Sequence, residues 1–150
     1  MPKVIMSFIV PGFDPAAAFD LVSDFKSYPE LTDAVVAVDL KDSEEPGIIS
    51  TWTVKFRRGL LCWTEHDVLD RAAGEIEFHQ LEGDFEVFDG YWRVRAAPGG
   101  TEVQFEAHFD LGMPTLADLL DPVAERALRD NIALILAGLF GEIHQVAKAS

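Results

Sequence analysis

Hydrophobic and polar residues alternate most regularly between residues 101 and 111. The odd positions from Val103 to Leu111 are apolar, and the even positions from Glu102 to Asp110 are polar. A period of two predicts a β-strand with one face on the core and the other in water. The segment before it places Phe88, Trp92 and Val94 on one side, and the glycines of Pro98-Gly99-Gly100 suit a tight turn. The pattern therefore predicts an antiparallel hairpin within residues 83–111.

Shorter segments with strand-like patterns precede this hairpin. They predict strands at residues 4–10, 34–40, 48–57, 60–69 and 75–81. Between the first two strands, Asp14 can cap a helix that has Pro15 at its first position and continues to Phe25. Tyr28-Pro29 interrupts that helix, and residues 29–32 are expected to form a second short one.

The period changes after residue 115. Apolar residues from Leu116 to Ile143 recur near helical spacing, which predicts one long C-terminal helix with a kink or a new first turn at Pro122. This order of elements predicts a single α+β domain over residues 1–150, with six to seven antiparallel strands around the helix. Any space that side chains leave between sheet and helix would form an apolar pocket.

Composition narrows the possible partners. The chain has 26 acidic and 12 basic side chains, for a net charge of −14, which argues against nucleic acids and anionic membranes. A single cysteine excludes an intrachain disulfide and fits a reducing compartment. No apolar run approaches the roughly 18 residues of a membrane span, and the short one before Pro11 is not a signal peptide. We therefore expect a cytoplasmic protein with no transmembrane segment.

Three local motifs resemble the START-like (SRPBCC, helix-grip) superfamily, and its polyketide cyclase/dehydrase and coenzyme-Q-binding group in particular. They are Tyr28-Pro29-Glu30-Leu31 after the first helix, Gly83-Asp84-Phe85 followed by Gly90-Tyr91-Trp92, and Gly100-Thr101 with Val103 before a final helix that contains Asn131. The resemblance implies a curved sheet that grips the C-terminal helix. It also implies a bulky, apolar, polyketide-like or cyclic ligand in an internal cavity, with no metal and no cofactor.

Members of this group differ in function, so three hypotheses stay open. The first is a polyketide cyclase, aromatase or dehydratase, with an acyl carrier protein as a conceivable partner. The alternative is a non-catalytic carrier or chaperone for a quinone or lipid. The third, a regulator that contacts the ribosome, is disfavoured by the acidic charge. The sequence leaves open whether the protein is an enzyme and whether it is a monomer or a homodimer.

The strand at residues 60–69 carries the candidate catalytic residues. Alternation places Trp63, Glu65 and Asp67 on one face. By resemblance, Trp63 matches a tryptophan that faces the cavity in aromatase/cyclases, whereas Asp67 replaces an arginine that orients the polyketide. If the carboxyl groups of Glu65 and Asp67 face the pocket, burial raises their pKa and suits them to general acid or base chemistry. The alternative is that both are solvated or paired with Arg93 or Arg95.

Aromatic residues at strand spacing are the candidate pocket wall, and ordinary core packing is the alternative explanation for each of them. With Tyr28 near the mouth and two positions of the long helix, the predicted ligand-binding residues are Tyr28, Trp52, Val54, Phe56, Trp63, Phe78, Phe88, Trp92, Phe105, Phe109, Ile132 and Leu136. The four histidines fall on separate elements without a ligand motif, so we expect no metal site.

Overall fold

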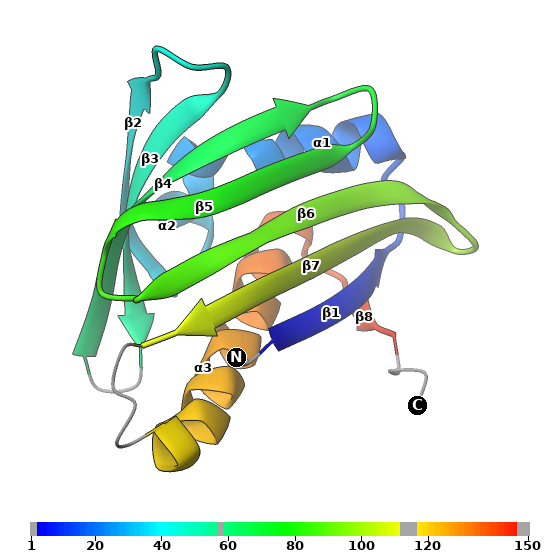
Figure 1. Ribbon diagram of the computed structural model, residues 1–150. Helices are drawn as coiled ribbons and strands as arrows, with labels where there is room; N and C mark the ends of the chain where they lie inside the picture. Colours follow the sequence, from blue (N-terminus) through cyan, green and yellow to red (C-terminus); the bar gives the residue numbers. More distant parts are fainter. Residues whose placement is uncertain (1–2, 57–58, 112–116, 147–150) are drawn as a thin grey trace.

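The computed structural model describes residues 3–56, 59–111 and 117–146 (Figure 1). The elements in chain order are β1 (Lys3–Val10), α1 (Pro15–Ser23), the 3-10 turn η1 (Phe25–Ser27), α2 (Tyr28–Leu31), β2 (Val35–Asp42), β3 (Ile48–Phe56), β4 (Gly59–Asp70), β5 (Glu75–Gly83), β6 (Val87–Ala97), β7 (Gly100–Asp110), α3 (Ala117–Phe140) and β8 (His144–Gln145). This is the α+β order that the hydrophobic pattern predicts.

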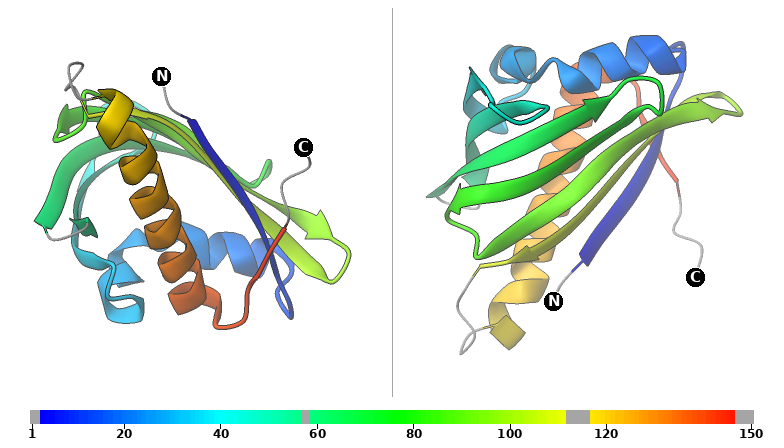
Figure 2. Two further views of the ribbon diagram at one scale, coloured as in Figure 1. Left: turned by 90° about the horizontal axis from the view of Figure 1, so that it is seen from below. Right: turned by 45° about the horizontal axis from the view of Figure 1, so that its top comes forward.

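The strands form one antiparallel sheet in the order β2-β3-β4-β5-β6-β7-β1-β8. The sheet curves around α3, which runs along its concave face, and α1 and α2 lie on the same side (Figure 2). This is the helix-grip arrangement. The apolar faces of the strands and of α3 therefore meet in the space between sheet and helix, where the core lies.

The predicted hairpin is present and supplies much of the concave face. Strands β6 and β7 pair from Val87↔Asp110 to Ala97↔Gly100. Gly99 and Gly100 have φ values of +88° and +148°, which L side chains rarely adopt. The expected alternation is confirmed, because Val103, Phe105, Ala107 and Phe109 are all buried.

The first helix begins as predicted. Asp14 is its N-cap, and the Asp14 carboxylate accepts a hydrogen bond of 2.8 Å from the backbone N–H of Ala17. It ends at Ser23 and not at Phe25 as predicted, and the chain continues as η1 to Ser27. Tyr28, expected to lie in the break, is the first residue of α2. Pro122 lies inside α3, so it starts no separate helix.

The sheet has eight strands where the sequence predicts six or seven. The additional strand is β8, whose two residues pair with Phe8 and Ile9 at the edge formed by β1. A two-residue strand held by backbone pairing has no alternation that a sequence pattern could reveal. The register of β4 against β5 also shifts between Thr64 and Glu65, next to the candidate catalytic residues.

Candidate functional site

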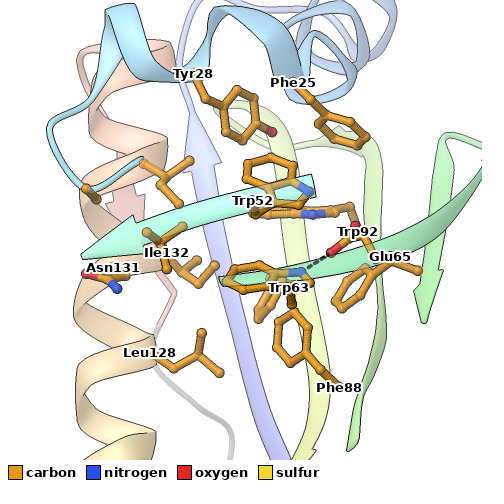
Figure 3. Close-up of a pocket in the computed structure, with 15 residues that line it drawn as sticks. Phe25, Tyr28, Trp52, Trp63, Glu65, Phe88, Trp92, Leu128, Asn131 and Ile132 are labelled. Atoms are coloured by element: carbon orange, nitrogen blue, oxygen red, sulfur yellow. Dashed lines mark hydrogen bonds between the residues drawn. The ribbon is translucent and has the colours of Figure 1, made fainter. Parts of the chain in front are cut away.

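A pocket lies between the concave face of the sheet and α3 (Figure 3). Aromatic and aliphatic side chains form most of its wall. The polar groups in the wall are the side chains of Glu65 and Asn131, the Tyr28 hydroxyl and the indole N–H groups. The lining residues are Phe25, Tyr28, Ala34, Trp52, Val54, Trp63, Glu65, Phe78, Phe88, Trp92, Phe105, Leu128, Asn131, Ile132 and Ile135. They come from η1, α2, the turn before β2, α3 and strands β3 to β7.

The pocket is small. Its cavity volume is about 60 Å³. One water molecule needs roughly 10–15 Å³ on this measure, so the space holds a few waters. Pockets for drug-sized ligands have volumes of roughly 300–1,000 Å³. The aromatic side chains therefore nearly fill the space, and a bulky ligand requires the wall to move.

The aromatic rings pack against one another across the strands. Trp52 and Trp63 pair directly between β3 and β4, and their rings are nearly parallel with centroids 6.2 Å apart. Phe88 contacts Trp63 edge to face at 5.2 Å, and Tyr28 contacts Trp52 at 5.4 Å. The Tyr28 hydroxyl donates a hydrogen bond of 2.5 Å to the carbonyl of Val22. Tyr28 is thus a fixed part of the wall.

A series of side-chain hydrogen bonds runs along the base of this aromatic wall. The Trp63 Nε1–H group donates to Glu65 Oε1 at 2.7 Å (Figure 3). The Trp52 Nε1–H group donates to Ser50 Oγ at 2.8 Å, and the Ser50 hydroxyl donates to Asp67 Oδ2. Glu65 and Asp67 are 5% and 0% exposed. Alternation along β3 and β4 therefore brings two carboxyl groups and one hydroxyl into the interior.

Burial sets the protonation of this carboxyl pair. The pKa of Glu65 lies well above its usual range because the side chain is buried, and a hydrogen bond to Asp67 and the Asp67 charge raise it further. Burial also raises the pKa of Asp67, but hydrogen bonds from Glu65 and Ser50 oppose that rise. Burial therefore favours the protonated form of Glu65 more strongly than that of Asp67, and we expect the pair to carry one negative charge near neutral pH.

The alternative that these carboxyl groups pair with Arg93 or Arg95 is wrong. Arg93 Nε lies 3.0 Å from Glu75 Oε1, and Arg95 Nε lies 2.9 Å from Glu102 Oε1, both on the other side of the sheet. The carboxyl groups of Glu65 and Asp67 are also not solvated, because both residues are buried.

Comparison with known proteins identifies the family. Residues 12–135 match the family described as polyketide cyclase/dehydrase and lipid transport. This chain belongs to that family.

Solved structures support the fold of this polyketide cyclase/dehydrase family member. A Thermus thermophilus protein is 22% identical with a TM-score of 0.83, over 93% of this chain and 95% of that one. An aromatase/cyclase from Streptomyces sp. R1128 is 15% identical with a TM-score of 0.79, over 93% and 92%. A START superfamily protein from Mycobacterium smegmatis is 16% identical with a TM-score of 0.74, over 93% and 97%. At these identities the likeness concerns the fold.

Most of the predicted ligand-binding residues surround the pocket of this family member. Phe56, Phe109 and Leu136 do not line it: Phe109 and Leu136 are buried in the core and Phe56 is partly buried against it. Asp67 does not line it either, but is connected to it through Glu65 and through the hydrogen bonds from Ser50 and Trp52. The lining residues that the sequence prediction missed are Phe25, Ala34, Leu128, Asn131 and Ile135. Leu128, Ile132 and Ile135 are four and three residues apart, and this helical spacing indicates that they share one face of α3, the face that lines the pocket.

The convex face of the same strands carries three of the four histidines. Strand register aligns His66, His79, Asp89 and His108 in one cross-strand row. His66 is 7% exposed because the chain at Gly47 approaches it, and a side chain at Gly47 would lie 3.0 Å from His66 Nε2. Within the described residues, no group of three or more His, Cys, Asp or Glu side chains could hold a metal ion.

No described helix is long and apolar enough to cross a membrane.

Proposed function

We propose that this family member binds a hydrophobic small molecule in the pocket and promotes its cyclisation or dehydration without a cofactor. The observation that carries the proposal is the Glu65 carboxyl group, which lines an aromatic pocket while burial raises its pKa. A carboxyl group that keeps its proton near neutral pH can act as a general acid. Membership of the polyketide cyclase/dehydrase family supports the same class of reaction.

In a dehydration, Glu65 donates its proton to the departing hydroxyl group of the ligand, and the C–O bond breaks to release water. Glu65 is then briefly an anion beside the Asp67 anion, which is unfavourable in a buried site. Glu65 relieves this repulsion by taking a proton from the neighbouring carbon as the double bond forms. Water has then been lost and Glu65 is restored. Asp67 does not touch the ligand in this scheme and acts as a positioning residue.

Binding a bulky ligand requires the pocket to widen. The Asn131 amide of α3 donates a hydrogen bond of 2.6 Å to the backbone carbonyl of Lys55 on β3, at the edge of the pocket. Thr32, at the C-terminal end of α2, and Leu134 form a second, longer bond of 3.4 Å between α2 and α3. We expect ligand entry to separate α3 from β3 at Asn131, because one hydrogen bond holds the two elements there.

A carrier of a quinone or lipid remains the second candidate. Its support is the lining, which is apolar apart from Glu65, Asn131, the Tyr28 hydroxyl and the tryptophan N–H groups. A carrier returns its ligand unchanged, whereas a dehydratase releases an unsaturated product.

The test uses a β-hydroxyketone, 4-hydroxy-4-phenylbutan-2-one, whose dehydration product absorbs in the near ultraviolet. We expect the protein to accelerate its dehydration and Glu65→Gln to lose most of that acceleration, by roughly 100-fold or more. Glu77→Gln, on the convex face of β5, is the matched control and should keep the wild-type rate. Equal rates in Glu65→Gln and wild type would contradict the role of Glu65. Binding without conversion by either protein would favour the carrier.

A further inference from the structure

Acidic and basic groups are unevenly distributed among the described residues that line the pocket. They include the Glu65 carboxyl group but no lysine, arginine or histidine. Within the described part of the chain, the buried polar and charged residues are Thr32, Ser50, Glu65, His66, Asp67 and Thr101. His66 is the only potential cation among these described residues, and it belongs to the convex face. Among the described residues, no basic side chain faces the carboxyl pair from the pocket side, and the two histidines that interact with Asp67, His66 and His79, lie on the convex face.

The carboxyl pair is also incompletely hydrogen-bonded. Asp67 is 0% exposed, and its Oδ2 atom accepts from Ser50. Its Oδ1 atom is buried without a well-formed hydrogen bond. A buried acceptor without a hydrogen bond lowers the stability of the folded protein, and the loss is larger when the group is ionised. Binding of a positive charge at Glu65 would offset this loss for the pair as a whole, because the two carboxyl groups interact directly.

The remaining wall is also suited to a positive charge. Trp52, Trp63 and Trp92 line the pocket together with Tyr28 and Phe88. The faces of aromatic rings attract cations, tryptophan most strongly, and the attraction grows when water is excluded. Aromatic walls around a carboxyl group form the kind of site that binds substituted ammonium groups. A carboxylate or phosphate ligand would instead lose its hydration opposite Glu65 without gaining a counter-charge.

We infer that the ligand of this pocket carries a positively charged nitrogen on a hydrophobic body, as in a substituted amine or quaternary ammonium compound. The inference rests on the proposed function, since it specifies the ligand of the same site. The ammonium group lies against the tryptophan rings with Glu65 beside it, and the apolar body extends towards Leu128 and Ile132 on α3 (Figure 3). The charge of the pair and the charge of the ligand then neutralise each other in the interior.

Three probes of nearly equal shape test this. Choline carries a trimethylammonium group, 3,3-dimethylbutan-1-ol has a neutral tert-butyl group in its place, and 3,3-dimethylbutanoate carries a negative charge. In isothermal titration calorimetry, the wild-type chain should bind choline most tightly, the alcohol less tightly and the carboxylate most weakly. We expect choline to bind roughly tenfold or more tightly than the alcohol. In the double variant Glu65→Gln/Asp67→Asn this preference should fall to near parity, while Glu77→Gln should keep it.

The outcomes separate the inference from the proposed function. If the alcohol binds as tightly as choline, or more tightly, the inference is overturned and an apolar binding pocket stands. If a preference for choline persists in the folded double variant, the carboxyl pair is not its origin and the inference is also overturned. If none of the probes binds, the inference is overturned, and the dehydration assay decides the proposed function separately. The wild-type order decides the question even if the double variant does not fold.

Discussion

Strands β4 and β5 carry titratable groups on both faces of the sheet, in opposite environments. On the concave face, Glu65 and Asp67 are buried, and burial raises the pKa of both carboxyl groups. On the convex face, His79 is exposed and its partner His66 is covered by the chain at Gly47. The comparison teaches that alternation assigns a residue to a face, while the elements packed on that face decide its chemistry.

Charge pairing also differs between the faces. On the convex side Arg93 bonds to Glu75 and lies over the Tyr91 ring at 4.4 Å. Such half-exposed pairs contribute about 0–1 kcal/mol each. On the concave side, Glu65 accepts a hydrogen bond from Trp63, Asp67 accepts one from Ser50, and the two carboxyl groups interact with each other. We expect this buried pair to lower the stability of the fold, because burial disfavours the charged form of each carboxyl group.

The sharpest way to test this contrast is to truncate neighbouring residues on opposite faces of β5. Phe78 is 5% exposed and its ring packs against Phe88 and Phe105. We expect Phe78→Ala to lower the free energy of unfolding by about 3–5 kcal/mol, through lost burial and the cavity left behind. The adjacent His79→Ala change should stay within about 0.5 kcal/mol, because His79 is exposed. Urea denaturation measures both.

A similar decrease in the free energy of unfolding in both variants would show that the convex face is packed as tightly as the concave face. A small loss in Phe78→Ala alone would show that the pocket wall collapses to fill the gap.

We expect Glu65→Gln to change the free energy of unfolding by less than Phe78→Ala does. The folded-state pKa of Glu65 is raised well above 4.5, so folding takes up a proton as pH rises past the unfolded value. Stability should therefore decrease by about 1.4 kcal/mol for each pH unit between the unfolded and folded pKa values. Glutamine resembles the protonated acid and lacks this loss. Glu65→Gln should consequently be more stable than wild type near neutral pH, with a flatter pH profile.

Thermal unfolding at several pH values provides the measurement, and Glu77→Gln is the exposed control on β5. A wild-type profile parallel to that of Glu65→Gln would mean that Glu65 ionises in the folded protein as it does in the unfolded chain.

Much of the concave face is predictable from the sequence because period-two alternation needs no knowledge of the partner strand. Alternation groups Trp52 and Phe105 with the apolar residues of their strands, and the family resemblance implies that Trp63 faces the cavity. The shared face of Glu65 and Asp67 follows from the same rule. Their burial does not, because it depends on Ser50, Tyr28 and α3, which only the folded chain brings together.

Other features need strand register or exact packing. The histidine row requires β4 to β7 to pair as they do, and single-strand patterns carry no register. Phe25 reaches the pocket because η1 follows α1, where the sequence predicts one continuous helix. The cavity volume of about 60 Å³ depends on side-chain rotamers around Trp52 and Trp63, which no pattern of residue types specifies.

The most direct test of the account is a carbon-13 NMR titration of the side-chain carboxyl groups in the wild-type protein. The central claim is that the pocket-side pair holds one proton and one negative charge near neutral pH. The account predicts a protonated Glu65 signal beside an ionised Asp67 signal at that pH, with the pKa of Glu65 raised by burial and by its neighbour. Ionised signals from both carboxyl groups near neutral pH would contradict it.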